Sequence, residues 1–244
     1  MIKKFIPNAV TLLNLTAGVI ALVFAFDNNL PMAFFWVCMG VFFDFWDGFL
    51  ARKLNVTGDL GVQLDSLSDM VTSGVVPGVV MFKLIEQTTQ EMGYNLSTEN
   101  YYLGILPFFA FIITLASAYR LAKFNIDPRQ TDVFIGLPTP ANAMVLVSLP
   151  LVIEQTGGDG WLFDMLSNPW VLIVISFISA FLLNANIKLF SLKMKEISWE
   201  KSKLQIMFLI FSAVMIFFLQ FGAIPIIVLV YIFISILLNS LEKQ

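Results

Sequence analysis

The sequence predicts an all-α integral membrane protein, a polytopic bundle of about eight transmembrane helices. Three observations indicate this class: hydrophobic residues make up 58% of the 244 residues, charged residues make up 13%, and the mean hydropathy is +0.84. Soluble domains typically contain about 45–50% apolar and about 25% charged residues. Because most of the length is apolar, functional residues are expected within the helices or in their short connections.

The individual helices follow from length, since a hydrocarbon core about 30 Å thick needs roughly 20 apolar residues. The expected spans are 5–26, 31–53, 65–86, 102–123, 138–154, 169–190, 203–221 and 223–241. Six of these spans lie within residues 1–190. Residues 191–244 would add a basic cytoplasmic loop and two C-terminal spans.

Lysine and arginine indicate the orientation of these spans. They cluster at 52–53, 120–129 and 188–203, at every second span boundary, as the positive-inside rule describes. Both termini are therefore expected in the cytoplasm, with the protein in the cell (inner or plasma) membrane. A nucleic-acid-binding surface would instead need a contiguous basic stripe on a soluble face.

Residue usage excludes several kinds of chemistry. The chain has no histidine, which removes Ser/His and Cys/His nucleophilic schemes and histidine-ligated zinc. Cys38 is the only cysteine and lies in the apolar stretch FFWVCMGVFF, which is typical of a small core residue. An enzyme built from this chain would use carboxylates, hydroxyls, amides and a few cations.

Two pairs of aspartates interrupt the apolar pattern of the second and third spans. Asp44 and Asp47 lie in FFDFWDGFLAR, and Asp65 and Asp69 lie in LDSLSD. At about 100° per residue, each pair shares one helix face. The face of the first pair also carries Gly48, Ala51 and Arg52. Intramembrane acids cost at least about 2.5 kcal/mol each at the membrane centre, which indicates a function.

If the second and third spans pack side by side, the four carboxylates meet near the cytoplasmic surface and need positive charge between them. All-oxygen ligands favour Mg²⁺ or Mn²⁺, and two such ions would clamp a pyrophosphate. Ca²⁺ also accepts this ligand type.

Two other interpretations of the aspartates stay open at this point. The aspartates could be neutralised in buried salt bridges with Arg52, Lys53, Arg120 and Lys123. Alternatively, the aspartates could line an ion or proton pathway. Gly48 and Ala51 would equally suit close helix packing, and Arg52 would suit an anchor at the membrane interface.

The spacing favours a third interpretation. It reads D-x-x-D-G-x-x-A-R, eight residues, then G-x-x-x-D-x-x-x-D, with fixed positions Asp44, Asp47, Gly48, Ala51, Arg52, Gly61, Asp65 and Asp69. In full, this pattern resembles the signature of the CDP-alcohol phosphotransferase family, over a region of roughly 5–190.

The resemblance implies a membrane enzyme that moves a substituted phosphoryl group from a CDP-linked donor to an alcohol and releases CMP. It implies that Asp44, Asp47, Asp65 and Asp69 bind divalent metal and that Asp69 is also the catalytic base. CDP and pyrophosphate contacts would come from Asp44, Gly48, Ala51, Arg52 and Gly61, together with Asn8 and Thr11 of the matching stretch PNAVTLLN. For Asn8, Thr11 and Asn14, helix capping or interhelical hydrogen bonding is an equal alternative. The resemblance also suggests a homodimer.

The acceptor is indicated by departures within the motif. Family branches that use glycerol 3-phosphate tend to read DPLADK, whereas this chain reads DSLSDM, with Ser66 and Met70 in place of proline and lysine. The stretches RLAKFN (120–125) and FIGLPTPANA (134–143) are similar to the branch that transfers the phosphatidyl group of CDP-diacylglycerol to L-serine. Candidate serine-binding residues are Arg120, Lys123 and Asn125, for which positive-inside anchoring is the alternative.

The expected function is therefore phosphatidylserine synthesis in the lipid bilayer. The alternatives are another acceptor of inositol, choline or glycerol type, a transporter with an acidic ion site, and a purely structural membrane protein.

Overall fold

A computed structural model of the protein describes residues 2–56, 58–92, 103–127, 134–190 and 199–241. Residues 191–198 of the predicted basic loop lie outside this part of the chain, as do 93–102 and 128–133 of two other predicted connections. The elements in chain order are α1 (Ile2–Phe26), α2 (Leu30–Lys53), α3 (Asp59–Asp69), the π-helical segment η1 (Met70–Val75), α4 (Val76–Glu91), the 3₁₀ segment η2 (Leu103–Phe111), α5 (Ile112–Ile126), β1 (Phe134–Ile135), α6 (Thr139–Gln155), α7 (Trp161–Leu166), α8 (Pro169–Asn184), β2 (Lys188–Leu189), α9 (Trp199–Leu219), the 3₁₀ segment η4 (Gln220–Gly222) and α10 (Ala223–Leu241).

The predicted class of multi-pass helical membrane protein is confirmed. Within the described residues, five helical stretches are long and apolar enough to cross a membrane, and their bounds are Phe5–Phe26, Leu30–Lys53, Asp59–Glu91, Gly104–Ile126 and Lys203–Leu241. The last stretch contains both α9 and α10. The fifth and sixth predicted spans correspond to α6 and α8, which are shorter, at 17 and 16 residues.

Two predicted boundaries differ from the structure. The third helix begins at Asp59 rather than 65, because Asp59 in its first turn complements the positive end of the helix dipole. The sixth ends at Asn184 rather than 190, where Ala185 adopts extended backbone. The following residues Lys188–Leu189 pair with Phe134–Ile135 as a two-stranded antiparallel sheet, which the prediction did not contain.

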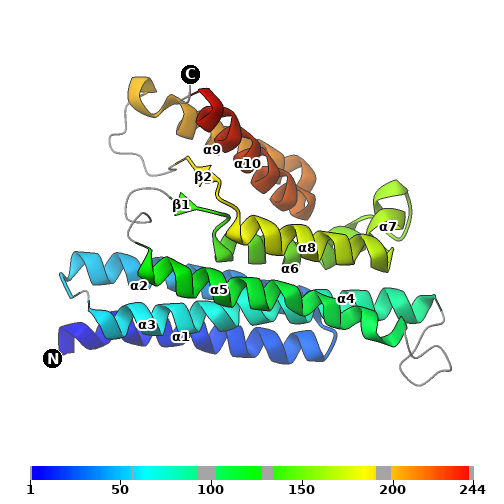
Figure 1. The fold of residues 1–244 in the computed structure, drawn as a ribbon, viewed down its shortest axis with the longest axis horizontal. Helices are drawn as coiled ribbons and strands as arrows, with labels where there is room; N and C mark the ends of the chain where they lie inside the picture. Colours follow the sequence, from blue (N-terminus) through cyan, green and yellow to red (C-terminus); the bar gives the residue numbers. More distant parts are fainter. Residues whose placement is uncertain (1, 57, 93–102, 128–133, 191–198, 242–244) are drawn as a thin grey trace.

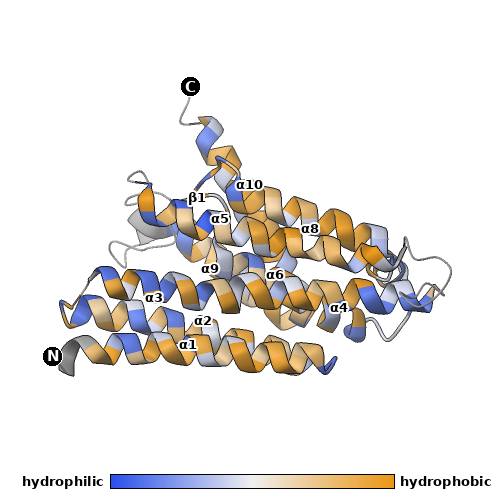
Figure 2. Cartoon of the chain, turned by 60° about the horizontal axis from the view of Figure 1, so that its bottom comes forward, coloured by the Kyte–Doolittle hydropathy of each residue, from blue (hydrophilic) through white to orange (hydrophobic). Residues whose placement is uncertain are grey.

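The helices are arranged around α3, η1 and α4, which run on as one rod. Of the apolar window of Asp59–Glu91, 72% is buried, against 17–39% for the other four stretches. Helices α1, α2 and α5 lie around this rod, and α6 and α8 lie over it. On the side away from α1, α10 contacts α6 and α9 lies beside α10 (Figure 1). Figure 2 shows apolar residues predominating along α1, α8 and α10, whereas α3 carries more hydrophilic ones.

Small residues allow α1 and α2 to approach each other and the central rod. Ala21, Ala25 and Ala33 are fully buried in one apolar cluster. Without a large side chain between them, backbones can pack closely, as is common between membrane helices. At the same junction, Thr72 of η1 donates a hydrogen bond from Oγ1 to the carbonyl of Asn14, at 3.1 Å.

The stretch FIGLP connects the sheet to α6 and holds the end of α8. Gly136 has a φ of 77°, a left-handed conformation that favours glycine. A Cβ at this position would meet the carbonyl oxygens of Leu183 and Ala185. The neighbouring Leu137 donates its backbone N–H to the carbonyl of Leu182, at 3.0 Å, and so satisfies one of the carbonyls left free at a helix C-terminus.

Candidate active site

Helices α2 and α3 bring three carboxylates together. Oxygen atoms of Asp44, Asp47 and Asp65 all lie within 4.8 Å of one another. Asp47 is buried, and Asp44 and Asp65 are partly buried. The predicted convergence of the second and third spans is therefore found, with three of the four aspartates in one cluster.

The fourth aspartate, Asp69, lies one helical turn beyond Asp65 and is 9% exposed. Asn14 of α1 donates a hydrogen bond from Nδ2 to Asp69 Oδ1, at 3.1 Å. Asp69 is also close enough to interact electrostatically with Asp65 and with Arg120 of α5. It therefore stands between the carboxylate cluster and α5, oriented from the side of α1.

The salt-bridge interpretation of the aspartates is contradicted. No lysine or arginine of the described residues forms an ion pair with any of the four carboxylates; the ion pair found there joins Lys83 and Glu86, at 3.0 Å. Lys53 instead lies over the ring of Phe49, with Nζ 5.7 Å from the ring centroid. The negative charge of the cluster is thus left without a basic side chain bound to it.

The cluster fits a divalent cation by its ligands. The side chains of Asp44 and Asp65 are within hydrogen-bonding contact, and two ionised carboxylates can stay so close only with a proton or a cation between them. Among the described residues, Asp47 Oδ2 is buried without a hydrogen-bond partner. Carboxylate oxygens are the ligands that Mg²⁺, Mn²⁺ and Ca²⁺ prefer.

Helix α1 forms a further wall of this site. The hydroxyl of Thr11 is placed between the carbonyl of Pro7, at 3.1 Å, and the carboxylate of Asp47, and its single proton serves one of them at a time. A Cβ added to Gly61 would lie 3.5 Å from Oδ1 of Asn8. Thr11 therefore borders Asp47, and Asn8 lies beside Gly61, one helical turn before Asp65.

Gly48, Ala51 and Arg52 border the cluster on α2. Arg52 is exposed and Ala51 is partly buried. A Cβ at Gly48 would lie 3.5 Å from Arg52 Nη1, so the guanidinium folds back over the glycine. The positive charge of Arg52 interacts with Asp47, one turn away on the same helix. The missing side chain at Gly48 leaves room for the guanidinium of Arg52.

The central rod and α5 run antiparallel to each other. This arrangement determines which residues of α5 lie beside the rod on the side of Asp69 away from the carboxylate cluster. Asn125 donates from Nδ2 to Oγ of Ser66, at 2.9 Å, at the outer end. At the inner end, a Cβ at Gly74 would lie 3.1 Å from Cβ of Ser117. Between these two pairs, Asp69 faces the charged side chain of Arg120.

Arg120 makes this side of the site polar and poorly satisfied. It is 6% exposed, and its Nε has no hydrogen-bond partner in the described part of the chain. The hydroxyls of Ser73 and Ser117, also buried, lack partners there as well. A buried guanidinium with a free donor is an expected binding place for an anionic group. Lys123, one turn further along, is partly buried.

Two features of the site were not predicted from the residues. The first is the π-helical segment that begins directly after Asp69. Such segments are frequent at functional sites. No residue pattern in the sequence predicted it. The second feature is the hydrogen bond from Asn14 to Asp69. The sequence left open whether Asn14 contacts a ligand or forms a capping or interhelical hydrogen bond, and the structure shows an interhelical hydrogen bond. The signal was the three-residue spacing of Asn8, Thr11 and Asn14 in an otherwise apolar helix.

Several known proteins are similar to this chain in sequence. The family described as CDP-alcohol phosphatidyltransferase matches residues 4–181. Similar curated proteins are named CDP-diacylglycerol–serine O-phosphatidyltransferase. The one of Bacillus subtilis (strain 168) is 34% identical over 146 residues, 60% of this chain and 75% of the relative. That of Methanocaldococcus jannaschii is 32% identical over 150 residues, 62% of each chain. That of Mycobacterium leprae is 28% identical over 165 residues, 65% of this chain and half of the relative.

Proposed function

Because the chain belongs to the CDP-alcohol phosphatidyltransferase family, we propose that it transfers the phosphatidyl group of CDP-diacylglycerol to the hydroxyl of L-serine, giving phosphatidylserine and CMP. The observation that carries the proposal is the cluster of Asp44, Asp47 and Asp65, formed by the family's signature residues at the junction of α2 and α3. The names of the similar proteins favour serine as the acceptor. The motif also favours an acceptor without a phosphate group, because Ser66 and Met70 replace the proline and lysine of the branches that use glycerol 3-phosphate.

Asp44, Asp47 and Asp65 would hold the metal, with Asp69 next to them. Two divalent ions, Mg²⁺ or Mn²⁺, would supply positive charge to the pyrophosphate of the donor and to the departing CMP. Arg52, folded over Gly48, adds a guanidinium at the open side of the cluster, where it can bind a phosphate oxygen. Ala51, Gly61, Asn8 and Thr11 would border the nucleotide.

Asp69 would act as the general base. It takes the proton of the serine hydroxyl as the serine oxygen forms a bond to the lipid-bearing β-phosphorus. The bond between that phosphorus and the bridging oxygen breaks, and CMP leaves with the electron pair. The hydrogen bond from Asn14 to Oδ1 holds the carboxylate in place for this transfer.

Arg120 would bind the carboxylate of serine, with Lys123 and Asn125 nearby. Its burial and its free Nε suit a small anionic group that enters beside Asp69. Asn125 is hydrogen-bonded to Ser66, which joins the acceptor side of the site to the metal-binding motif.

The same proposal includes the setting of the enzyme. We place the active site at the cytoplasmic face of the cell membrane, with both termini cytoplasmic, because the basic residues cluster at this end. Residues 1–190 would form the catalytic core and 191–244 an extension of a basic loop and two spans. A homodimer is the proposed assembly.

The test is CMP release by the purified chain with CDP-diacylglycerol and Mn²⁺ or Mg²⁺, with and without L-serine. Serine-dependent CMP release and radiolabelled phosphatidylserine are expected. Release with inositol, choline or glycerol 3-phosphate in place of serine would assign another acceptor. Solute flux through proteoliposomes without CMP release would instead favour a transporter.

A further inference from the structure

The C-terminal helix pair is attached to the core at both ends. At one end, Gln155 of α6 donates to the carbonyl of Leu219, at 3.4 Å. At the other, Tyr231 donates its hydroxyl to the carbonyl of Phe190, at 2.8 Å, and Asn239 donates to the carbonyl of Lys188, at 2.7 Å. Between these contacts, a space remains between α10 and the helices α6 and α8.

This separation leaves a cavity of about 710 Å³ between α6, α7, α8 and α10. The volume is within the range of about 300–1,000 Å³ that is usual for ligand pockets. No residue of α1–α5, and hence none of the four aspartates, lines it. The cavity is therefore separate from the candidate active site.

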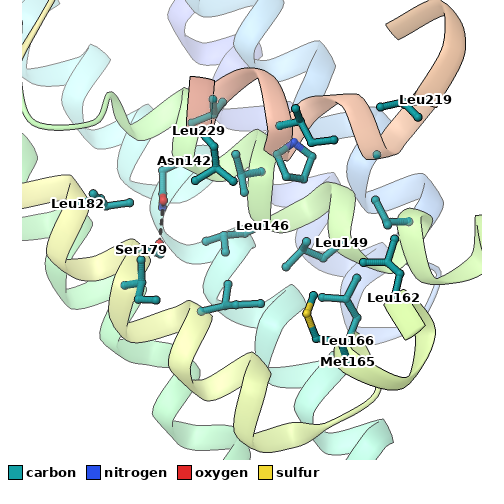
Figure 3. Close-up of a pocket in the computed structure, with 18 of the residues that line it drawn as sticks. Asn142, Leu146, Leu149, Leu162, Met165, Leu166, Ser179, Leu182, Leu219 and Leu229 are labelled. Atoms are coloured by element: carbon teal, nitrogen blue, oxygen red, sulfur yellow. Dashed lines mark hydrogen bonds between the residues drawn. The ribbon is translucent and has the colours of Figure 1, made fainter. Parts of the chain in front are cut away.

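The walls of the cavity are mainly apolar, and its polar residues lie toward the two ends: Gln155 and Thr156 at one, Asn142 and Ser179 at the other. Figure 3 shows Leu146 and Leu149 along its floor and Leu162, Met165 and Leu219 toward one end. Interiors of proteins are close-packed, so a hydrocarbon-lined space of this size in a bilayer is a place for hydrocarbon. Leu229 lines it and is 62% exposed, so the cavity opens sideways toward the surrounding lipid.

The other end carries a polar pair with an unused donor. Ser179 donates a hydrogen bond to Oδ1 of Asn142, at 2.7 Å (Figure 3). Asn142 is 2% exposed, and its Nδ2 finds no hydrogen-bond acceptor among the residues that the structure covers. An unpaired buried amide donor is unfavourable, so an acceptor oxygen supplied by a ligand would stabilise it.

The direction of the cavity is that of a lipid. Asn142 lies in the first turns of α6, which start beside β1 at the end of the bundle where α2 and α3 meet (Figure 1). From Asn142 to Thr156 the lining follows α6 for about 21 Å, at about 1.5 Å per residue. One leaflet contributes about 15 Å of a hydrocarbon core about 30 Å thick, so one chain fits lengthwise.

We propose that this cavity binds one hydrocarbon chain of a membrane glycerolipid, whose ester oxygen accepts a hydrogen bond from Nδ2 of Asn142. The bound lipid belongs to the leaflet at the aspartate end and is distinct from the lipid that is processed there. The C-terminal pair α9–α10 then serves to form a second lipid site on the core. The proposal holds whichever alcohol the enzyme uses.

The test uses full-length protein made in cells fed a diazirine-labelled fatty acid, which enters their glycerolipids. After irradiation of the membranes, adducts are mapped by mass spectrometry. Labelling is expected within Leu146–Val152 of α6, because this segment is buried and bulk lipid does not reach it. Absence of labelling there, with Leu237 on the exposed face of α10 labelled, would overturn the proposal.

Variants sharpen the result. Leu149→Trp fills the cavity and should reduce the α6 adduct to background, whereas Leu115→Trp, at a 67% exposed position of α5, should leave it unchanged. Asn142→Leu removes the donor at similar size and should weaken retention of a glycerolipid by about fivefold. Unchanged retention in Asn142→Leu would contradict the assigned ester contact. Labelling of α6 in the unmodified protein supports or contradicts the proposal even if one of these variants folds poorly.

Discussion

Asn14 and Asp69 come from helices α1 and α3 and are joined by a hydrogen bond of 3.1 Å from Nδ2 to Oδ1. Both side chains are buried, and Gly40 leaves the room in which Asn14 lies: a Cβ there would be 3.0 Å from Asn14 Oδ1. The first helix thus orients the carboxylate proposed as the base.

Replacing Asn14 should therefore affect turnover. In Asn14→Ala, Asp69 loses its orienting donor, and turnover should fall by about 10–100-fold, as for other residues that orient the groups of a metal site. Steady-state CMP release measures this. The matched control is Asn29→Ala, which removes the N-cap of α2 and should lower stability while preserving turnover. Equal rates in the two variants would contradict the positioning role.

Asp69→Asn should abolish most of the chemistry but preserve the site. Loss of a general base typically lowers the rate by about 10²–10⁴-fold. Asparagine keeps the size of the side chain, so binding of CDP, followed by calorimetry, should remain measurable. A rate near that of the unmodified enzyme would refute the assignment of the base.

Asp65→Asn should weaken metal binding. The carboxylate lies within the cluster formed with Asp44 and Asp47, so fewer charged ligands remain for the ion. Binding of Mn²⁺ to the metal-free protein, measured by the electron paramagnetic resonance of free Mn²⁺, should become weaker. The rate of CMP release should fall further than the loss of about 10–100-fold that is expected for an orienting residue. Asp59→Asn changes an exposed carboxylate on the same helix and should have neither effect.

Arg120→Lys should raise the KM for serine. Lysine keeps the charge but loses the planar fork that binds a carboxylate with two hydrogen bonds. A rise of about tenfold or more is expected, with the KM for CDP-diacylglycerol unchanged. Arg52→Lys provides the matched comparison, because it should raise the KM for CDP-diacylglycerol and leave that for serine. If Arg120→Lys raised the KM for CDP-diacylglycerol and Arg52→Lys raised that for serine, Arg120 would be assigned to the donor and Arg52 to serine.

Gly40→Ala should destabilise the junction of α1, α2 and η1, because the new methyl group meets Cγ2 of Thr72. A loss of about 1–3 kcal/mol in unfolding free energy is typical of such overpacking and should appear as a lower thermal midpoint. The second substitution Thr72→Ser removes Cγ2 and should restore part of the loss. It should not rescue Gly18→Ala, where the contact is with Thr72 Oγ1. Gly222→Ala, with open space around it, is the control.

Much of this protein could be predicted from its residues because membrane helices and ligand motifs are local features. Apolar runs of span length predict the helices, since the bilayer leaves the backbone few alternatives. Asp44 and Asp47 are three residues apart and Asp65 and Asp69 four, so helix geometry alone aligns each pair. The end of the sixth helix was predicted less accurately, because the backbone of Ala185 and the pairing of Lys188 with Ile135 depend on contacts distant in sequence.

The sequence by itself determined the class and indicated a function for the four aspartates, because charge in an apolar span is costly and has few uses. Only the tertiary structure decided that three carboxylates share one cluster while Asp69 turns toward Asn14 and Arg120. Only the tertiary structure, too, shows the cavity between α6, α7, α8 and α10 with Asn142 at its end. Such relations depend on how helices from distant parts of the chain pack, and the periodicity of a single helix carries no information about its partner.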